Sequence, residues 1–161
     1  MLTIPVSYRR ILRAYLRPLV VTALDPGSPE ALVLDPELLW AARLDELEQV
    51  ELWTPKGDRM VTSVGLGIAG EVQVHGRLTQ KFHAGDVLTV AAYAFVPPDT
   101  LEAHLAHFVE IGNGNRAIEI KCRTIRAQKI HPSYVSAESE GEAWAVPAMS
   151  EAQAALGAEA R

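Results

Sequence analysis

Short apolar runs and alternating apolar–polar runs recur along the chain, and turn signals separate them. These runs predict strands at residues 16–24, 32–34, 49–53, 59–64, 71–75, 87–95 and 107–112, and a more weakly patterned strand at 117–128. The connecting segments carry Gly, Pro or Asp, which favour chain reversal. Pro18 lies inside the first strand and predicts an edge position or a bulge there. The pattern is typical of a β-barrel or a β-sandwich.

Helix signals are few. Asp35 offers a capping side chain, Pro36 suits the first helical position, and Glu37 places an acid in the first turn. The apolar stripe that follows predicts a helix over residues 36–44, and a second short helix is predicted over residues 99–107. Two helices among many short strands do not give the alternation that a parallel βαβ sheet requires.

The character of the chain changes near residue 130. Residues 1–130 are predicted to form one β-barrel domain. Residues 131–161 are acidic and rich in Ala, and they are predicted either to fray or to become ordered only by docking on a neighbouring molecule.

Composition and charge exclude several classes of protein. The chain has 161 residues, of which 48% are hydrophobic and 22% charged, as is usual for a globular domain. A formal net charge of −5 argues against a nucleic-acid partner, and no apolar run approaches the roughly 18 residues that cross a bilayer. The single cysteine, Cys122, cannot form an intrachain disulfide, so a reducing cytoplasm is expected.

The N-terminal segment is basic and contains no acid before Asp25. Its arginines are Arg9, Arg10, Arg13 and Arg17. A basic start without acids is found in transit peptides. A strand pattern follows directly here, so we interpret the segment as an opening strand whose arginines face water or a cleft.

Two motifs match known chemistry but lack its context. Residues 65–70 match the dinucleotide fingerprint GxGxxG, which requires a helix directly after it. Residues 71–75 alternate like a strand instead, so we interpret the glycines as a hairpin loop. His104 and His107 have a spacing that could place two imidazoles on one helix face, but no second ligand pair accompanies them. We interpret both as surface or interface histidines, and no metal site is predicted.

Several further stretches have the order, spacing and turn glycines of a known family. They are residues 34–39 with Ala41 and Ala42, 50–53, 57–62, His75 with Gly76, and 84–91. From about residue 11 to residue 120 the chain therefore resembles the pyruvoyl-dependent aspartate 1-decarboxylases. The resemblance implies a mainly β fold, a double-psi β-barrel with two or three short helices, and assembly as a homotetramer.

The resemblance also implies a chemistry. In that family the chain cleaves itself between a glycine and a serine, and the serine becomes a pyruvoyl group. This lyase cofactor serves the decarboxylation of aspartate to β-alanine, a step of pantothenate biosynthesis. The protein supplies orientation and charge to the group, and an arginine suits the substrate carboxylate.

The family's site residues are only partly retained. Arg59 stands where the family has its substrate-carboxylate arginine, and Thr62 matches the threonine that assists self-cleavage. Ser63 replaces the tyrosine proposed as a proton donor, and its hydroxyl is a far poorer acid. Tyr15 replaces the first-strand lysine, and Arg17 replaces a nearby histidine.

The departures extend to the processing loop. His75 stands where the family has an asparagine before the glycine that matches Gly76. An alignment without gaps puts Ala31 where the processed serine belongs, and alanine has no hydroxyl to attack the preceding carbonyl. Gly27 and Ser28 lie three residues upstream. Ser28 would become the pyruvoyl precursor only if the three residues after it bulged before the strand, and the first of them is a proline.

Three interpretations follow. In the first, which we favour, the chain is a divergent barrel without a pyruvoyl group, and its ancestral pocket binds or converts a small carboxylate, for instance by acid–base or cyclisation chemistry. The residues expected to line that pocket are Arg59, Arg77, His75, Gly76, Tyr15 and Arg17, with the hydroxyls of Thr62 and Ser63 as catalytic candidates. In the second the chain is an active aspartate 1-decarboxylase that is processed at Ser28. In the third it is a non-catalytic assembly partner of a true decarboxylase.

Overall fold

The computed structural model describes residues 7–125 of the chain, and they form mainly β structure. In chain order the elements are β1 (Arg9–Val20), β2 (Ala23–Asp25), β3 (Ala31–Leu34), α1 (Pro36–Ala42), β4 (Gln49–Trp53), β5 (Arg59–Leu66), β6 (Val72–His75), the 3-10 helix η1 (Gly76–Gln80), β7 (Val87–Val96), the 3-10 helix η2 (Pro98–Ala103), β8 (Leu105–Gly112), the 3-10 turn η3 (Asn113–Asn115) and β9 (Arg116–Thr124).

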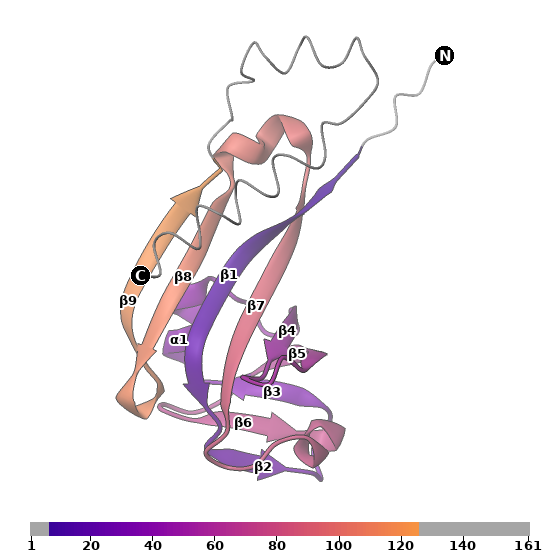
Figure 1. Ribbon diagram of the computed structural model, residues 1–161, viewed down its shortest axis with the longest axis vertical. Helices are drawn as coiled ribbons and strands as arrows, with labels where there is room; N and C mark the ends of the chain where they lie inside the picture. The colour runs from indigo at the N-terminus through magenta and orange to yellow at the C-terminus, as the bar shows by residue number, and fades with distance from the viewer. Residues whose placement is uncertain (1–6, 126–161) are drawn as a thin grey trace, which may run out of the picture. The chain divides into compact units, whose positions relative to one another are not determined.

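The strands form a mixed sheet in the order β2-β6-β3-β5-β4-β7-β1-β8-β9. Three of the pairs, β1 with β8, β2 with β6 and β3 with β5, are parallel, and the others are antiparallel. The long strands β1, β7, β8 and β9 run side by side, and the short strands β2, β3 and β6 cross near one end of them (Figure 1). This arrangement confirms the predicted mainly β fold and is consistent with a double-psi β-barrel.

The first strand is longer than the sequence pattern predicts. Arg9 already pairs with Val96 of β7, although the predicted strand begins only at residue 16. The ladder to β7 shifts register between Leu16 and Leu19, which confirms the bulge predicted from Pro18. The alternative of an edge strand is wrong, because β1 lies between β7 and β8.

Helix α1 begins as its sequence predicts. The Asp35 carboxylate accepts a hydrogen bond of 2.7 Å from the Glu37 amide, and Pro36 occupies the first turn. The helix ends at Arg43, which adopts a left-handed conformation with φ of 56°. The second predicted helix is only partly correct. A 3-10 helix spans Pro98–Ala103, but the chain becomes extended at His104 because β8 pairs with β1 and β9 from there on.

No helix follows the glycine-rich segment, as predicted, but the prediction of a hairpin loop is wrong. Gly65 and Leu66 end β5, residues 67–70 lead on to β6, and β5 and β6 each pair with β3 rather than with each other. The last glycine of the segment, Gly70, donates its amide to the second oxygen of Asp35 at 2.6 Å. Asp35 therefore caps α1 and anchors this loop with a single carboxylate that is 3% exposed. The loop has a structural role, and the helix N-terminus that a pyrophosphate would need is absent from it.

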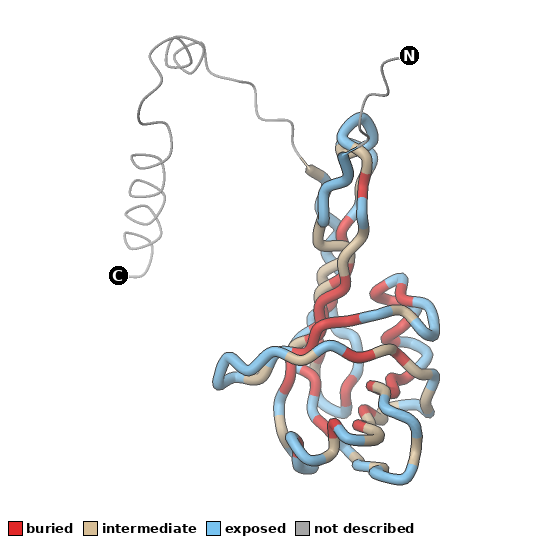
Figure 2. Tube along the Cα trace, turned by 90° about the vertical axis from the view of Figure 1, so that its right-hand side faces the viewer, coloured by how far each residue is buried: buried red, intermediate tan, exposed pale blue. Residues whose placement is uncertain are grey.

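The core lies where α1 and the short strands pack on the long ones. Its largest fully buried side chains include Phe82, Leu16, Leu19, Leu34 and Leu52. Burial is concentrated in this region, whereas the end of the long strands around η2 is largely exposed (Figure 2). Within the described residues no helix is long and apolar enough to cross a membrane. The tail predicted over residues 131–161 and the end of the predicted strand 117–128 lie outside the described residues.

Candidate functional site

The turn between β2 and β3 holds the Gly27–Ser28 pair in a compact hydrogen-bonded arrangement. The Asp25 carboxylate accepts one bond from the Gly27 amide, at 3.0 Å, and one from the Ser28 hydroxyl, at 2.6 Å. The Ser28 bond, followed by the Gly27 bond, lowers the pKa of Asp25. Asp25 thus stays ionised, and the Ser28 hydroxyl is engaged within its own turn.

Ala31 opens β3 and lies among the residues that the sequence analysis assigned to the processing site. It pairs with His75 of β6, and His75 also pairs with Asp25 of β2. The parallel ladder between β3 and β5 begins one residue later, where Leu32 pairs with Val64. The strand pairing therefore brings Ala31, rather than Ser28, next to His75.

Gly76 fixes the same register through close backbone contact. Its φ of 68° is left-handed, and a Cβ on it would lie 2.7 Å from the Glu30 Cα and 2.8 Å from the Glu30 nitrogen. The residue that packs against Gly76 is consequently Glu30, which directly precedes Ala31. This agrees with the ungapped alignment, in which Glu30 and Ala31 take the positions of the glycine–serine pair.

The two hydroxyl residues of β5 differ in their surroundings. Thr62 is buried, and its Oγ1 has no hydrogen-bond partner among the described residues. Ser63 is half-buried and pairs with Gln49 of β4. Neither hydroxyl contacts a base that would raise its nucleophilicity within the described chain, so neither forms a nucleophile–base pair of the kind that covalent catalysis uses.

His75 and Arg77 lie at the start of η1. The His75 Nε2 is 2.8 Å from the Gln73 side-chain oxygen, and the Arg77 Nε is 3.7 Å from a carboxylate oxygen of Glu30. The Arg77 side chain is 90% exposed, so its ion pair with Glu30 is weak. Both residues border the Glu30–Ala31 peptide, as the resemblance implies for His75.

Arg59 lies away from these residues, in a pocket of about 330 Å³. There it and a second arginine bind the same carboxylate. Arg59 of β5 and Arg10 of β1 both donate to the Oε1 atom of Glu51 on β4. Burial raises the pKa of Glu51, but the bonds from Arg59 and Arg10 outweigh it and hold the pKa below its ordinary value. Glu51 in turn raises the pKa of Arg59.

Sequence reasoning missed Arg10 and Glu51 as members of this pocket. The basic N-terminal run indicated only that its arginines face water or a cleft, and it did not single out Arg10. Glu51 lies in an alternating strand, where an acid is normally solvent-exposed, yet it is 4% exposed. Its burial depends on Arg10, which lies 41 residues away along the chain, so no local pattern could reveal it.

Tyr15 and Arg17 line a third place, a pocket of about 630 Å³ formed by β1, β8 and β9. The Tyr15 ring lies 5.8 Å from the Phe108 ring, and the Arg17 guanidinium lies 5.9 Å from the Tyr15 ring centre. Lys121 of β9 also lines this pocket and is bonded to Glu119 at 2.9 Å. Within a single chain, the residues expected to share one cleft thus lie in three separate regions: the Arg59 pocket, the Tyr15–Arg17 pocket, and the surroundings of His75 and Arg77 at the start of η1.

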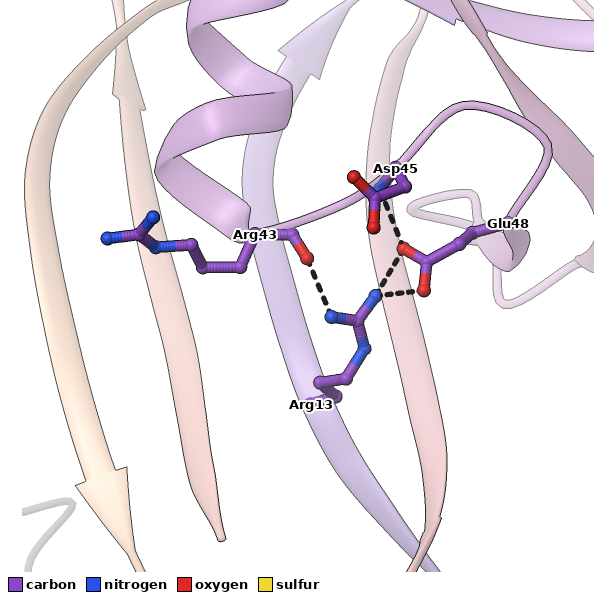
Figure 3. A network of polar contacts seen from close by, with 4 residues as sticks. All are labelled: Arg13, Arg43, Asp45 and Glu48. Atoms are coloured by element: carbon purple, nitrogen blue, oxygen red, sulfur yellow. Dashed lines mark hydrogen bonds and ion pairs between the residues drawn. The ribbon is translucent and has the colours of Figure 1, made fainter.

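A polar network adjoins the Arg59 pocket and holds α1 against β1 (Figure 3). Arg13 donates to both carboxylate oxygens of Glu48 and, at 2.6 Å, to the carbonyl of Arg43 at the end of α1. Glu48 also accepts the Asp45 amide at 2.9 Å. Because Glu48 lines the Arg59 pocket, Arg13 neutralises the second acid of that pocket.

The two histidines whose spacing resembles that of metal ligands, His104 and His107, have other surroundings in the structure. The His104 Nε2 is 2.8 Å from the Leu12 carbonyl oxygen, and burial, with smaller effects of Arg43 and Arg13, lowers the pKa of His107. Across residues 7–125 no group of three His, Cys, Asp or Glu side chains is close enough to hold a metal ion.

Comparison with known proteins gives a consistent result. A family model described as aspartate decarboxylase matches residues 7–118. Aspartate 1-decarboxylase of Ralstonia nicotianae is 33% identical over 116 residues, which cover 70% of this chain and 97% of that protein. Aspartate 1-decarboxylase 2 of a Polaromonas species is 30% identical over 117 residues, covering 71% of this chain and 93% of that protein. Aspartate 1-decarboxylase of a Sulfurihydrogenibium species is likewise 30% identical over 117 residues, covering 71% of this chain and 87% of that protein.

Proposed function

This chain belongs to the aspartate decarboxylase family, and we propose that it is a divergent member that binds a small carboxylate in the ancestral pocket without forming a pyruvoyl group. The observation that carries the proposal is the contact of Gly76 with Glu30, which supports Ala31 as the residue at the processing position. A methyl side chain cannot attack the preceding carbonyl. The residues present at that position therefore do not fit the group that the family makes there.

Ser28 offers a poor substitute for the missing serine. Its hydroxyl already donates to Asp25, and Pro29, Glu30 and Ala31 separate it from the point where β3 meets His75. Moving Ser28 beside Gly76 would break the Asp25 turn and unpair the first residue of β3. Each lost hydrogen bond of this kind costs about 1 kcal/mol, so the turn as it stands disfavours the rearrangement.

Carboxylate binding is supported by Arg59. A guanidinium presents several donors in a planar fork that matches a carboxylate. Arg59 stands at the position of the family's substrate-carboxylate arginine. Its side chain is 50% exposed at the wall of a pocket. The cationic residues Arg17 and Arg77 lie at the two other places described above and would bind further polar groups of the ligand.

We also propose that the functional unit is a homotetramer, as the resemblance implies. In the family, groups reach the pocket from a neighbouring subunit. In such an assembly, Tyr15 and Arg17 of one chain could lie in the same site as Ala31 and His75 of a second chain. Light scattering on the full chain tests this, and a monomer would count against it.

The experiment for carboxylate binding is isothermal titration of the full-length chain with L-aspartate, succinate and acetate at low ionic strength. Binding of a dicarboxylate that Arg59→Ala weakens supports the proposal. No measurable binding of any of the three by the wild-type chain would contradict it and favour a non-catalytic assembly partner.

A second candidate, an active decarboxylase processed at Ser28, is favoured by the activity that the relatives' names state. Incubation with L-aspartate and quantification of β-alanine distinguishes the two. Under our proposal no β-alanine forms above a Ser28→Ala control, whereas formation that depends on Ser28 would replace our proposal with this candidate.

A further inference from the structure

One carboxylate oxygen of Glu51 accepts hydrogen bonds from two guanidinium groups. The Nη2 atoms of Arg10 and Arg59 both donate to Oε1, so the two cations lie side by side at the wall of the 330 Å³ pocket. Their side chains are 46% and 50% exposed, while that of Glu51 is 5% exposed. The acid is therefore buried behind the arginines, and the arginines face the pocket.

The charges of this cluster do not balance. Two guanidiniums and one carboxylate leave one positive charge in excess. Glu48 also lines the pocket, but Arg13 engages both of its oxygens (Figure 3), so it is not available to the cluster. A further anion between the two guanidiniums would relieve their mutual repulsion and neutralise the excess.

Aromatic rings hold the two arginines in place. The Arg10 guanidinium lies 3.7 Å from the centre of the Tyr93 ring, and the Arg59 guanidinium lies 5.7 Å from that of Trp53. Together with Glu51, the rings restrict side chains that would otherwise lose much conformational entropy on binding a ligand. The donors that Glu51 does not use are thus oriented before any ligand arrives.

We infer that Arg10 and Arg59 form a clamp for one carboxylate of a small organic acid, and that Glu51 is the residue that positions both. The inference rests on the proposed function and adds Arg10 as a second binding residue, which the family resemblance does not supply. A carboxylate that bridges two forked donors receives more charge-assisted hydrogen bonds than Arg59 alone can give. The apolar side chains of Val61 and Phe95 line the same pocket and suit the carbon skeleton of such an acid.

The test is a set of titrations of the full-length chain with L-aspartate and succinate. Arg10→Ala and Arg59→Ala are each expected to weaken binding about tenfold to hundredfold, because each removes charge-assisted hydrogen bonds. Arg10→Lys keeps the charge and can still pair with Glu51 but loses the fork, so an intermediate loss is expected. Arg9→Ala is the matched control, since Arg9 is the preceding residue of β1, is exposed and lies outside the pocket.

Salt dependence separates a binding role from a structural one. If both arginines contact the ligand, affinity falls as ionic strength rises, and it falls less steeply in Arg10→Ala and Arg59→Ala than in the wild type. Thermal melts of each variant establish that it is folded. If Arg10→Ala does not fold, Arg10→Lys carries the test.

The outcomes are distinguishable. If Arg59→Ala weakens binding while Arg10→Ala and Arg10→Lys match Arg9→Ala, the clamp is refuted and the proposed carboxylate site at Arg59 stands. If none of the substitutions changes the affinity of a ligand that binds, the ligand lies elsewhere, and both the clamp and the Arg59 site are refuted.

Discussion

Gly76→Ala tests the packing on which the assignment of the processing position rests. The substitution adds a methyl group where φ is 68° and where the new Cβ would lie 2.7 Å from the Glu30 Cα. The left-handed conformation costs an alanine about 1–2 kcal/mol. Forcing a methyl group against backbone that must move adds about 1–3 kcal/mol. Gly76→Ala should therefore destabilise the protein by about 2–5 kcal/mol.

Gly114→Ala provides a matched control. Gly114 also has a φ of 68°, but a Cβ there would meet no heavy atom within 4 Å. It should incur the conformational cost alone, about 1–2 kcal/mol. The difference between the two variants then isolates the contact with Glu30.

The assay is urea denaturation of both variants and the wild type at one fixed protein concentration, because any assembly makes apparent stability depend on concentration. Gly76→Ala is expected to be the less stable variant by at least about 1 kcal/mol. Equal destabilisation would mean that Glu30 does not abut Gly76. The register that puts Ala31 at the processing position would then be refuted.

Three further predictions concern the polar groups of the fold. Thr62→Val should stabilise the protein by about 1 kcal/mol in thermal or urea unfolding, because it removes a buried hydroxyl that has no partner among the described residues; destabilisation would show that this hydroxyl is bonded. Arg13→Ala should destabilise by about 1–2 kcal/mol, with the partly exposed Glu48 pair discounted for solvent, while Arg9→Ala should change little; equal effects would refute the role of the network at the end of α1. Since Arg59 and Arg10 lower the folded-state pKa of Glu51, its contribution to stability is full above the ordinary glutamate pKa and is lost as pH falls through the lowered value. Glu51→Gln should therefore flatten the acid side of the stability–pH curve, and an unchanged curve would contradict the assigned pKa shift.

Most of the fold could be predicted because its signals are local. The cap at Asp35, the proline after it and the alternation over residues 49–53 each specify an element within a few positions, and the structure confirms α1 and β4. The start of β1 could not be found in this way. Its first two residues are arginines, and they are part of the strand because they pair with the far end of β7, more than eighty residues away.

The second helix shows how tertiary pairing overrides a local preference. Pro98 and Asp99 start a helical turn as a sequence pattern predicts, and the turn forms. From Leu105 onward the backbone joins β1 on one side and β9 on the other, and the strand ladder replaces the helix. Propensity is a weak guide wherever a long-range partner is available.

The candidate site was only partly predictable. Arg59, Thr62, His75 and Gly76 were identified by collinearity with a known family, whereas Glu51 and Arg10 were not, because their importance lies in a contact between distant strands. The proposal that Ala31 stands at the processing position came from the sequence. Its significance depends on the register of β3, which the contact between Gly76 and Glu30 supplies.

The central claim is that this member of the family does not cut its own chain. Its most direct test is the intact mass of the purified full-length protein, measured before and after warm incubation, with Ser28→Ala treated identically. The account predicts one species at the full-length mass, 17.5 kDa, in every sample. Two fragments that meet between Gly27 and Ser28, present in the wild type and missing from Ser28→Ala, would contradict it.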